Sequence, residues 1–301
     1  MEENLPVFLR ERLLKEYKKD IVEKIILGYM QKRKVTLRVN TIKMKEDELE
    51  NFLINSKINY SKVSFYSSAY ILENIREEEI RNWEFYKEGK IYLQSLSSML
   101  PPLVLEPKAK ENILDMAAAP GGKTTQISAL SENTALITAC EKNKIRYERL
   151  EYNVNKQGAK GINLMRIDAR NLSDFFSFDK ILLDAPCSGS GTLNLKNENI
   201  EKNFTEELIE RSVKLQETLL KKAIKILKVG GELIYSTCSI LKEENEDLLE
   251  RILNKNLELI PIANNIFENV PKLPVKLEGT LCVMPNELYE GFFVAKIRKK
   301  N

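Results

Sequence analysis

Residues 111–126, ENILDMAAAPGGKTTQ, join an apolar strand candidate to a helix candidate through a turn of small residues. The turn follows Asp115, and its Ala and Gly residues allow backbone amides to come close to a ligand. A helix that begins directly after such a turn points its N-terminus at the ligand and favours an anionic group there. The stretch therefore predicts a strand, a ligand-binding loop and a helix in succession.

The alternation of strand and helix continues towards the C-terminus. Strand candidates follow at residues 135–141, 162–168, 180–186 and 231–237, and helical stretches at 122–131, 143–158 and 205–228 separate most of them. This order predicts a parallel sheet with helices on both faces, an α/β Rossmann-like fold. After a helix at 242–254, the segments GTLCVMP (279–285) and EGFFVAKIRKK (290–300) predict two closing strands.

The first hundred residues have a less regular pattern of helices and short strands. Apolar residues recur at helical spacing within residues 5–33. Strands are predicted at 35–42, 63–65 and 69–72, a helix at 45–56, and a strand that runs into a helix at 89–105. Pro101, Pro102 and Pro107 punctuate the chain after that. We therefore expect a smaller α+β domain at residues 1–105 and a larger domain at 106–301.

The composition excludes several classes of chemistry. The 301 residues include no histidine, which removes Ser-His-Asp catalysis, Cys-His catalysis and His-ligated zinc. The four cysteines lie 44 to 51 residues apart and form no CxxC pair, so we expect neither a metal site nor a disulfide scaffold. No apolar run is long enough to cross a bilayer, and the N-terminal pattern is not that of a signal peptide. These observations predict a cytoplasmic protein with no membrane partner.

Acidic residues stand at or beside the ends of four strand candidates: Asp115, Glu141, Asp168 and Asp184. In sheets of this kind, ligands bind beyond the carboxyl ends of the strands. Helix capping is the alternative explanation, because Asp is a good N-cap residue. Four such residues in register favour a polar ligand.

Two ligands compete for the loop after the first strand. Residues 117–124 nearly match the phosphate-binding pattern G-x-x-x-x-G-K-[ST], so a P-loop NTPase is one alternative. Against it, Ala117 replaces the first glycine, Pro120 lacks an amide donor, and the Asp115 carboxylate would repel a triphosphate. A nucleoside that carries an amino acid fits better, because Glu141 can accept both ribose hydroxyls. S-adenosyl-L-methionine is such a molecule, with its ammonium on Asp115 and its carboxylate on the loop amides.

Two cysteines follow the fourth and fifth strand candidates. Cys187 lies in LLDAPCSGSGT and Cys238 in YSTCSI, whereas Cys140 and Cys282 lie in apolar runs typical of buried thiols. A thiolate that adds to carbon 6 of a pyrimidine makes carbon 5 nucleophilic enough to accept a methyl group. A second thiol can assist the later elimination, and Asp184 can hydrogen-bond the cytosine edge. The pair therefore indicates methylation of a pyrimidine.

Several motifs together resemble one known family. DMAAAPGGKTTQ, Glu141, DAPCSGSGT, STCS and EGFFVAKI are similar to segments of the RNA (cytosine-5)-methyltransferases of the Sun/Fmu and bacterial RsmF type. LRVNT (37–41) and YLQSLSSMLPPLVL (92–105) are similar to segments that flank the family's RNA-binding region. The resemblance implies a class I methyltransferase sheet of seven strands with the last one antiparallel. It also implies an RNA-binding function for residues 1–105 and a catalytic function for residues 106–301.

The resemblance implies a role for each matching position. Cys238 would be the nucleophile and Cys187 would promote product release, with Lys123 and Asp184 close to the catalytic centre. In addition to Asp115, the donor site would comprise Ala117, Ala118, Ala119, Pro120, Gly121, Gly122, Lys123, Glu141, Asp168 and Asp184.

The RNA partner is signalled more weakly. Residues 31–43 carry five basic side chains and no acidic one, so Lys32, Arg33, Lys34 and Arg38 are candidate phosphate contacts. An ordinary solvated helix end is the alternative. A paired cytosine cannot reach a thiol, so the target base must be extruded or single-stranded.

Small-subunit (16S) ribosomal RNA is the expected substrate, and transfer RNA is an alternative substrate for the same chemistry. An inactive RNA-binding scaffold is an alternative of another class.

DNA cytosine-5-methyltransferases also have a Pro-Cys dipeptide, and Glu268-Asn269-Val270 matches one of their motifs. That tripeptide lies 81 residues after Cys187 and would leave Cys238 without a role. We therefore expect an RNA enzyme, monomeric and without a DNA partner.

Overall fold

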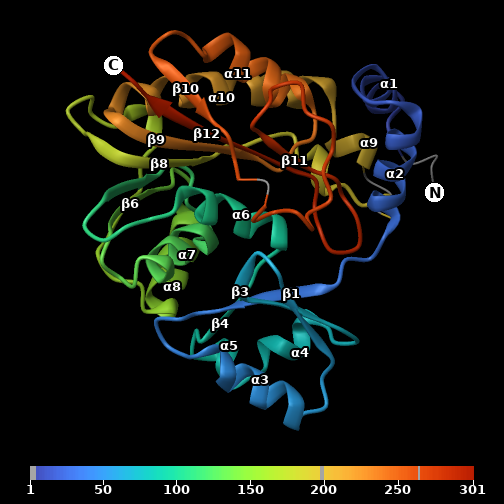
Figure 1. Cartoon of the computed structure of the whole chain (residues 1–301), viewed down its shortest axis with the longest axis vertical. Helices are drawn as coiled ribbons and strands as arrows, with labels where there is room; N and C mark the ends of the chain where they lie inside the picture. The colour runs from blue at the N-terminus through green and yellow to red at the C-terminus, as the bar shows by residue number, and fades with distance from the viewer. Residues whose placement is uncertain (1–4, 197–199, 264) are drawn as a thin grey trace.

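The computed structural model describes residues 5–196, 200–263 and 265–301, which form a large unit and a small unit (Figure 1). The large unit is built on one mixed sheet in the order β10-β12-β9-β8-β5-β6-β7, with β11 added beside β12. Its strands are β5 (Asn112–Asp115), β6 (Leu136–Cys140), β7 (Ile162–Met165), β8 (Phe178–Asp184), β9 (Leu227–Thr237), β10 (Leu257–Ile260), β11 (Leu281–Val283) and β12 (Phe292–Lys299).

The five strands from β5 to β9 are parallel, and β12 runs antiparallel to β9. This arrangement confirms the predicted Rossmann-like α/β fold with an antiparallel last strand. β9 begins at Leu227, four residues before its predicted start, because the chain is already extended where Leu227 pairs with Phe178.

Helices cover both faces of the sheet, as predicted. They are α7 (Gly122–Leu130), α8 (Lys144–Gln157), α9 (Ile200–Asn203), α10 (Glu206–Ile226), α11 (Glu246–Ile252) and the short 3-10 helices η2 (Ala169–Asn171), η3 (Ser190–Thr192) and η4 (Lys242–Glu244). Local signals begin two of them: Asn143 caps α8 by accepting from the Arg146 amide, and Thr205 caps α10 by accepting from the Leu208 amide.

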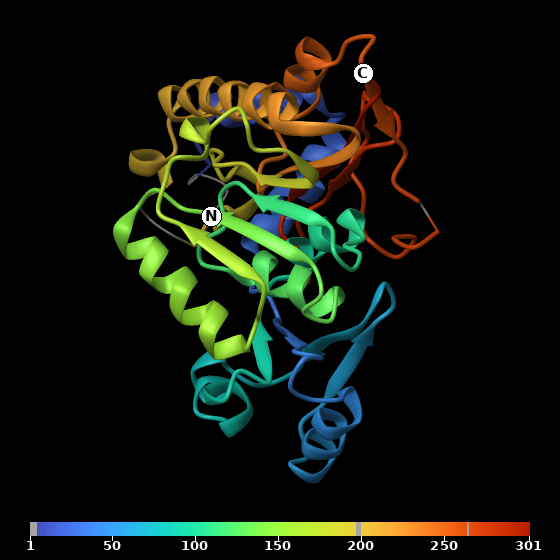
Figure 2. The same cartoon turned by 90° about the vertical axis from the view of Figure 1, so that its left-hand side faces the viewer.

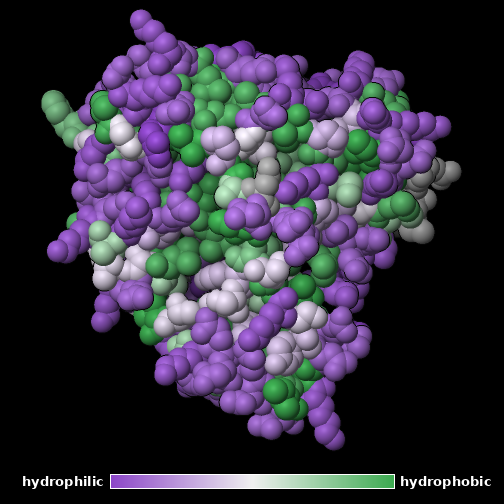
Figure 3. All heavy atoms as spheres, viewed as in Figure 1, coloured by the Kyte–Doolittle hydropathy of each residue, from purple (hydrophilic) through white to green (hydrophobic). Residues whose placement is uncertain are grey.

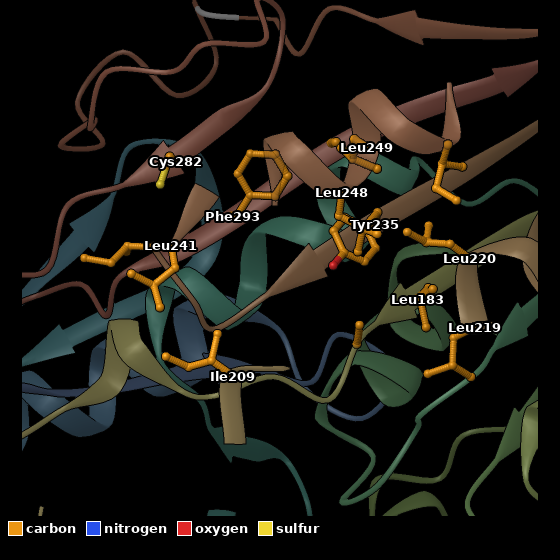
Figure 4. Packing of buried hydrophobic residues seen from close by; sticks show 14 of the residues in the cluster. Leu183, Ile209, Leu219, Leu220, Tyr235, Leu241, Leu248, Leu249, Cys282 and Phe293 are labelled. Atoms are coloured by element: carbon orange, nitrogen blue, oxygen red, sulfur yellow. The ribbon is translucent and has the colours of Figure 1, made fainter. Parts of the chain in front are cut away.

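The core on one face of the sheet lies under α10 and α11. Tyr235 and Phe293 point from β9 and β12 towards Leu248 and Leu249 of α11, and all four are fully buried (Figure 4). Burying each such side chain contributes about 1.5–3 kcal/mol relative to leaving it exposed. Successive residues of a strand point to opposite faces, so Ile234 belongs to the core on the other side, under α6 and α7.

The N-terminal helices belong to the packing of the large unit. α1 (Val7–Glu16) and α2 (Lys19–Met30) bury Leu9, Leu13 and Ile25 in the same cluster as Leu241 and Phe293. Figures 1 and 2 both show these blue helices against the body that holds the large sheet. We refer to α1 and α2 together as the N-terminal hairpin.

The small unit follows the N-terminal hairpin. It contains β1 (Val35–Val39), α3 (Glu46–Asn55), β2 (Tyr60–Val63), β3 (Tyr66–Leu72), α4 (Glu77–Arg81), α5 (Glu84–Lys87) and β4 (Ile91–Leu93). Its sheet has the order β2-β3-β1-β4, and all of its pairings are antiparallel. The chain then returns to the large sheet through α6 (Leu96–Leu105). The domain boundary at residue 105 stays a prediction.

The outer surface is mostly polar. Hydrophilic side chains cover most of the face in Figure 3, and apolar ones show among them, most continuously across its middle. Within the described ranges, no helix combines the length and the apolar character that a bilayer crossing needs.

Arg38 of β1 joins the two units. Its side chain is fully buried, and its guanidinium donates to Gln94 Oε1 at 2.9 Å, to the Gly122 carbonyl at 3.0 Å and to Thr125 Oγ1 at 2.8 Å. It also stacks on the Tyr92 ring at 5.1 Å. The expected contact between Arg38 and RNA is therefore wrong, because this cation faces the interior and the first turn of α7.

Replacing Arg38 with methionine should lower the free energy of unfolding by about 2–3 kcal/mol, because buried acceptors on Gln94, Gly122 and Thr125 would lose a charged donor. Urea unfolding followed by circular dichroism measures this change. The exposed Arg149→Met is the matched control and should change stability by no more than about 0.5 kcal/mol. Equal unfolding midpoints for the two variants would contradict the role given to Arg38.

Candidate active site

A cavity of about 360 Å³ opens at the carboxyl ends of β5, β8 and β9. The loop after β5 forms one wall, and the start of α6 and the start of β12 form others. The lining residues are Tyr92, Leu93, Gln94, Ser95, Ser98, Asp115, Ala117, Ala118, Ala119, Pro120, Gly122, Lys123, Asp184, Thr192, Cys238, Glu290 and Phe292. Most of the predicted donor residues thus share one cavity with Cys238.

The loop after β5 is held from two sides. The Ala118 amide donates to the Cys140 carbonyl at 2.9 Å, and Arg146 and Asn153 of α8 donate to the carbonyls of Ala119 and Pro120. The Ala119–Pro120 peptide bond is cis. Gly121 has φ of 104°, a left-handed conformation that favours glycine, directly before α7 begins. The backbone of this loop is therefore ordered by contacts that leave its other side to the cavity.

Asp115 is a buried carboxylate whose two oxygens differ. Thr124 Oγ1 donates to Oδ2 at 2.7 Å, whereas Oδ1 is buried and has no hydrogen-bond partner within the described residues. Burial raises the pKa of Asp115 to about 6. An unpaired carboxylate oxygen in a cavity wall fits a cationic group of a ligand, such as an ammonium.

Lys123 and Asp184 form an ion pair in the wall of the cavity that Cys238 also lines. Lys123 Nζ lies 2.7 Å from Asp184 Oδ2 and donates to Ser98 Oγ at 2.8 Å, and Ser236 Oγ donates to Asp184 Oδ1 at 2.7 Å. Burial lowers the pKa of Lys123, but the Asp184 carboxylate outweighs it, so the pKa is raised overall and the amine stays charged. The ion pair fixes the start of α7 to the end of β8.

Glu141 and Asp168 lie farther along the same edge of the sheet. Glu141 is buried, accepts from the Asn143 amide at 2.8 Å and lies 3.4 Å from the Arg146 guanidinium. Asp168 caps η2 through the Arg170 amide and pairs with the Arg170 guanidinium at 2.6 Å. The hydrogen bonds from Arg170 lower the pKa of Asp168 to about 2. Asp168 thus makes the capping contact of the alternative explanation, and donor binding by both residues stays a prediction.

The thiols of Cys187 and Cys238 are in contact. Their Sγ atoms lie 2.8 Å apart, and Cys238 lines the cavity. The hydrogen bond with Cys238 and burial raise the pKa of Cys187 well above its ordinary value, so Cys187 keeps its proton at neutral pH. Cys140 and Cys282 are buried in the core, as predicted.

The loop after β8, residues 185–192, carries Cys187, and we call it the Cys187 loop. Glu244 supports this loop, and the sequence did not single it out. Glu244 is fully buried, and its carboxylate accepts from the Ser188 amide at 2.8 Å, from Ser188 Oγ at 2.5 Å and from Gln216 Nε2 at 3.0 Å. It lies in the run KEENED (242–247), which has the composition of a solvated surface, and no periodicity distinguishes it from its acidic neighbours.

Two glycines also support the Cys187 loop. The Gly291 amide donates to the Gly191 carbonyl at 2.8 Å, and a Cβ on Gly191 would lie 2.0 Å from the Gly291 carbonyl oxygen. The loop after Cys187 and the start of β12 can therefore approach this closely only without side chains. The signal was present in DAPCSGSGT, whose glycines indicate a close backbone approach.

The basic segment before β1 lies at a surface cavity of about 930 Å³. Lys32 is exposed, Arg33 and Lys34 are half-buried, and Lys34 Nζ lies 3.1 Å from Glu73. The cavity wall also carries Glu77, Glu78 and Glu79, so its charge is mixed. Contact of Lys32, Arg33 and Lys34 with RNA stays a prediction.

Acidic and sulfur side chains do not gather into a metal site: in the described ranges no three or more His, Cys, Asp or Glu residues are arranged to hold an ion.

A family model described as 16S rRNA methyltransferase RsmB/F matches residues 102–298. Ribosomal RNA small subunit methyltransferase F of Shewanella piezotolerans is 34% identical, over 88% of this chain and 57% of that protein. The 25S rRNA (cytosine-C(5))-methyltransferase nop2 of Schizosaccharomyces pombe is 32% identical, over 97% of this chain and 50% of that protein. The chain therefore spans only about half the length of these relatives.

Among solved structures, NSun6 from Pyrococcus horikoshii with SFG is similar over all of both chains, with a TM-score of 0.87 and 25% identity. The similarity includes the small unit as well as the large sheet.

Replacing Asp115 with asparagine should stabilise the folded chain at neutral pH. Because burial raises the pKa of Asp115 from 3.8 to about 6, the folded chain binds this proton more tightly than the unfolded chain, and stability is lost as the pH rises through about 6. The neutral variant lacks this loss, so it should be more stable than the wild type by on the order of 2 kcal/mol above that pH.

Urea unfolding between about pH 4 and 7 measures this difference, which should vanish at the acidic end. Asp174→Asn is the control, because Asp174 is an exposed carboxylate paired with Lys222 and Lys225. Its stability relative to the wild type should not rise with pH. A constant difference for Asp115→Asn across the range would contradict the raised pKa.

Proposed function

The chain belongs to the RsmB/F family of 16S rRNA methyltransferases, and from this premise we propose that it transfers a methyl group from S-adenosyl-L-methionine to carbon 5 of a cytosine in RNA. The observation that carries the proposal is the contact between the Cys187 and Cys238 thiols, 2.8 Å apart, at the cavity formed by the loop after β5. A thiol pair beside a loop suited to a methyl donor fits covalent catalysis on a pyrimidine.

The residues present fit the methyl donor. The unpaired Oδ1 of Asp115 would accept from the ammonium group, and the loop from Ala117 to Gly122 would hold the carboxylate at the start of α7. Glu141 would accept from the ribose hydroxyls. When bound, S-adenosylmethionine supplies an electrophilic methyl group. A nucleoside triphosphate is disfavoured because the Asp115 carboxylate would face its phosphates.

Cys238 would act on the target base. Its thiolate adds to carbon 6 of cytosine, which gives carbon 5 the electrons to take the methyl group. A base, which water can supply, then takes the proton on carbon 5, and the electrons of that carbon–hydrogen bond re-form the ring double bond as the Cys238 thiolate leaves carbon 6. Asp184 would accept from the cytosine edge, and its 2.7 Å ion pair with Lys123 would hold the carboxylate in position.

Cys187 would assist product release. It keeps its proton at neutral pH because contact with Cys238 and burial raise its pKa. Before addition it can donate that hydrogen bond to the Cys238 sulfur. After addition it lies beside the carbon–sulfur bond that must break.

We propose small-subunit ribosomal RNA as the substrate, on the basis of the family description and of the small-subunit relatives. Transfer RNA stays the alternative substrate. Cys238 lies in a cavity wall, so the target cytosine would have to be extruded or unpaired to reach it.

Incubation with S-adenosylmethionine should raise 5-methylcytidine in unmodified small-subunit ribosomal RNA, and mass spectrometry of the hydrolysed nucleosides measures it. Large-subunit ribosomal RNA and transfer RNA are the parallel pools, and Cys238→Ala is the inactive control. A gain confined to transfer RNA would overturn the proposed substrate but keep the reaction. No gain in any pool, with donor binding demonstrated by calorimetry, would support the inactive scaffold instead.

The two cysteine variants should fail in opposite ways. Cys238→Ala should form no covalent RNA adduct, whereas Cys187→Ala should accumulate one in the presence of the donor, because addition proceeds and release does not. Denaturing gel electrophoresis with labelled RNA separates the two results. Cys140→Ala is the matched control, since that thiol is buried away from the cavity. Exchanged phenotypes would overturn the assignment of Cys238 as the nucleophile.

A further inference from the structure

Two tyrosines of the N-terminal hairpin hold the two cysteine loops from outside the cavity. The Tyr29 hydroxyl donates to the Ser190 carbonyl at 2.6 Å, three residues after Cys187. The Tyr17 hydroxyl donates to the Ile240 carbonyl at 2.7 Å, two residues after Cys238. Both tyrosines are buried, so each thiol loop receives one buried hydrogen bond from the same helical hairpin.

Further contacts fix the hairpin against the same loops. The Leu195 amide donates to the Tyr29 carbonyl at 3.1 Å, and the Lys242 amide donates to Glu16 Oε2 at 3.0 Å. Gly28 lies against the Pro285 carbonyl, where a Cβ would come within 2.0 Å of the oxygen. These contacts leave the hairpin little freedom to move relative to the loops that carry the thiols.

The two cysteine loops are also bonded to each other. The Gly191 amide donates to the Cys238 carbonyl at 2.9 Å, and Ser190 Oγ accepts from the Ile240 amide at 3.0 Å. Ser190 and Ile240 are also the residues whose carbonyls accept from Tyr29 and Tyr17. The tyrosine hydroxyls therefore act at the positions where one loop meets the other.

The hydroxyls are suited to a fixed structural contact. Burial raises the pKa of both tyrosines above the ordinary value, so both hydroxyls keep their protons at neutral pH and can donate. The loop that carries Cys187, CSGSGT (187–192), consists mainly of Ser and Gly, which pack few atoms against the core and lose much backbone entropy on ordering. This loop therefore needs partners outside its own sequence. The loop that carries Cys238 is also anchored by Ile240 and Leu241, which are fully buried.

We propose that Tyr17 and Tyr29 are positioning residues that set the relative placement of the Cys187 and Cys238 thiols. Tyr29 acts on the loop of Cys187, and Tyr17 acts on the loop of Cys238. The catalytic consequence rests on the proposed function, whereas the placement of the thiols does not. A displacement of about 1 Å at reacting groups can cost about a hundredfold in rate, so the loss of one hydroxyl should be measurable.

The first experiment measures thiol placement without RNA. Diamide oxidises the pair: each thiol gives up one hydrogen, the two sulfurs form a bond, and the diamide azo group is reduced to a hydrazine. Mass spectrometry detects the loss of two hydrogens and the linked peptides. Tyr17→Phe and Tyr29→Phe should each slow this step about tenfold, because the two thiols are no longer held together.

Tyr70→Phe is the matched control. Tyr70 is also fully buried, and its hydroxyl donates to Glu50 at 2.8 Å, but it lies in the small unit. Its oxidation rate should equal that of the wild type. Rates for Tyr17→Phe and Tyr29→Phe that equal or exceed the wild-type rate, in protein that still binds S-adenosylmethionine, would overturn the proposal.

The second experiment separates the two tyrosines by their effect on the reaction. Donor affinity should stay unchanged in both variants, while kcat falls about tenfold to a hundredfold. Tyr29→Phe should accumulate the covalent RNA adduct, as expected for a displaced Cys187, and Tyr17→Phe should form the adduct more slowly. The same adduct behaviour in both variants would overturn the assignment of each tyrosine to one loop.

The two experiments also separate this proposal from the proposed function. A wild-type protein that methylates no RNA but shows the expected oxidation rates would contradict the function and keep the positioning role. Loss of S-adenosylmethionine binding in a variant would show a general failure of folding, and Tyr17→Met and Tyr29→Met, which remove the hydroxyl donor but keep an apolar side chain in the core, would then replace the phenylalanine variants in the oxidation assay. Oxidation rates equal to or above the wild-type rate in the folded methionine variants would overturn the proposal.

Discussion

The ion pair between Lys123 and Asp184 is the contact on which the site depends. It spans the junction of the loop after β5 and the end of β8, and Ser98 of α6 accepts a second hydrogen bond from the same amine. Removing either partner would leave a half-buried charge without its counter-ion, which destabilises the fold. The same pair places a cation near the buried carboxylate of Asp115, whose second oxygen has no partner of its own within the described chain. Lys123 therefore interacts with two carboxylates of the cavity wall, Asp184 directly and Asp115 through space.

Strand–helix alternation after residue 110 was sufficient to predict the large sheet. Parallel strands buried on both faces appear as continuous apolar runs, and the carboxyl end of each run places Asp115, Glu141, Asp168 and Asp184 at one edge. The nearness of the two cysteines was predictable for the same reason. Cys187 follows the end of β8 and Cys238 follows the end of β9, and these parallel strands are neighbours in the sheet. The contact distance of 2.8 Å between the thiols was not predictable, because it depends on how the two loops that carry the thiols are held.

The wrong prediction for Arg38 and the omission of Glu244 have a common physical origin. A local charge pattern reports composition but not the direction in which a side chain points. Arg38 belongs to a segment, residues 31–43, that carries five basic side chains, yet β1 is buried on both faces and Arg38 faces α7. Glu244 belongs to an acidic run, yet it is the buried acceptor that holds the Cys187 loop. In both cases the direction of the side chain depends on partners that are distant in the sequence, Gly122 for Arg38 and Ser188 for Glu244. Periodicity within a short window contains no information about such partners.

The same reasoning explains why the N-terminal helices pack with the large sheet although the small unit follows them in the chain. The loop after β8 carries Cys187 in a run of Ser and Gly residues with no large side chain to pack, whereas the loop after β9 buries Ile240 and Leu241 directly after Cys238. A loop of Ser and Gly is poorly held by its own packing. Groups from other parts of the chain hold the thiol loops by hydrogen bonds, namely the Glu244 carboxylate and the hydroxyls of Tyr17 and Tyr29. A rigid helical hairpin with an apolar face in the core can supply hydrogen bonds at fixed positions, whereas a third loop could not.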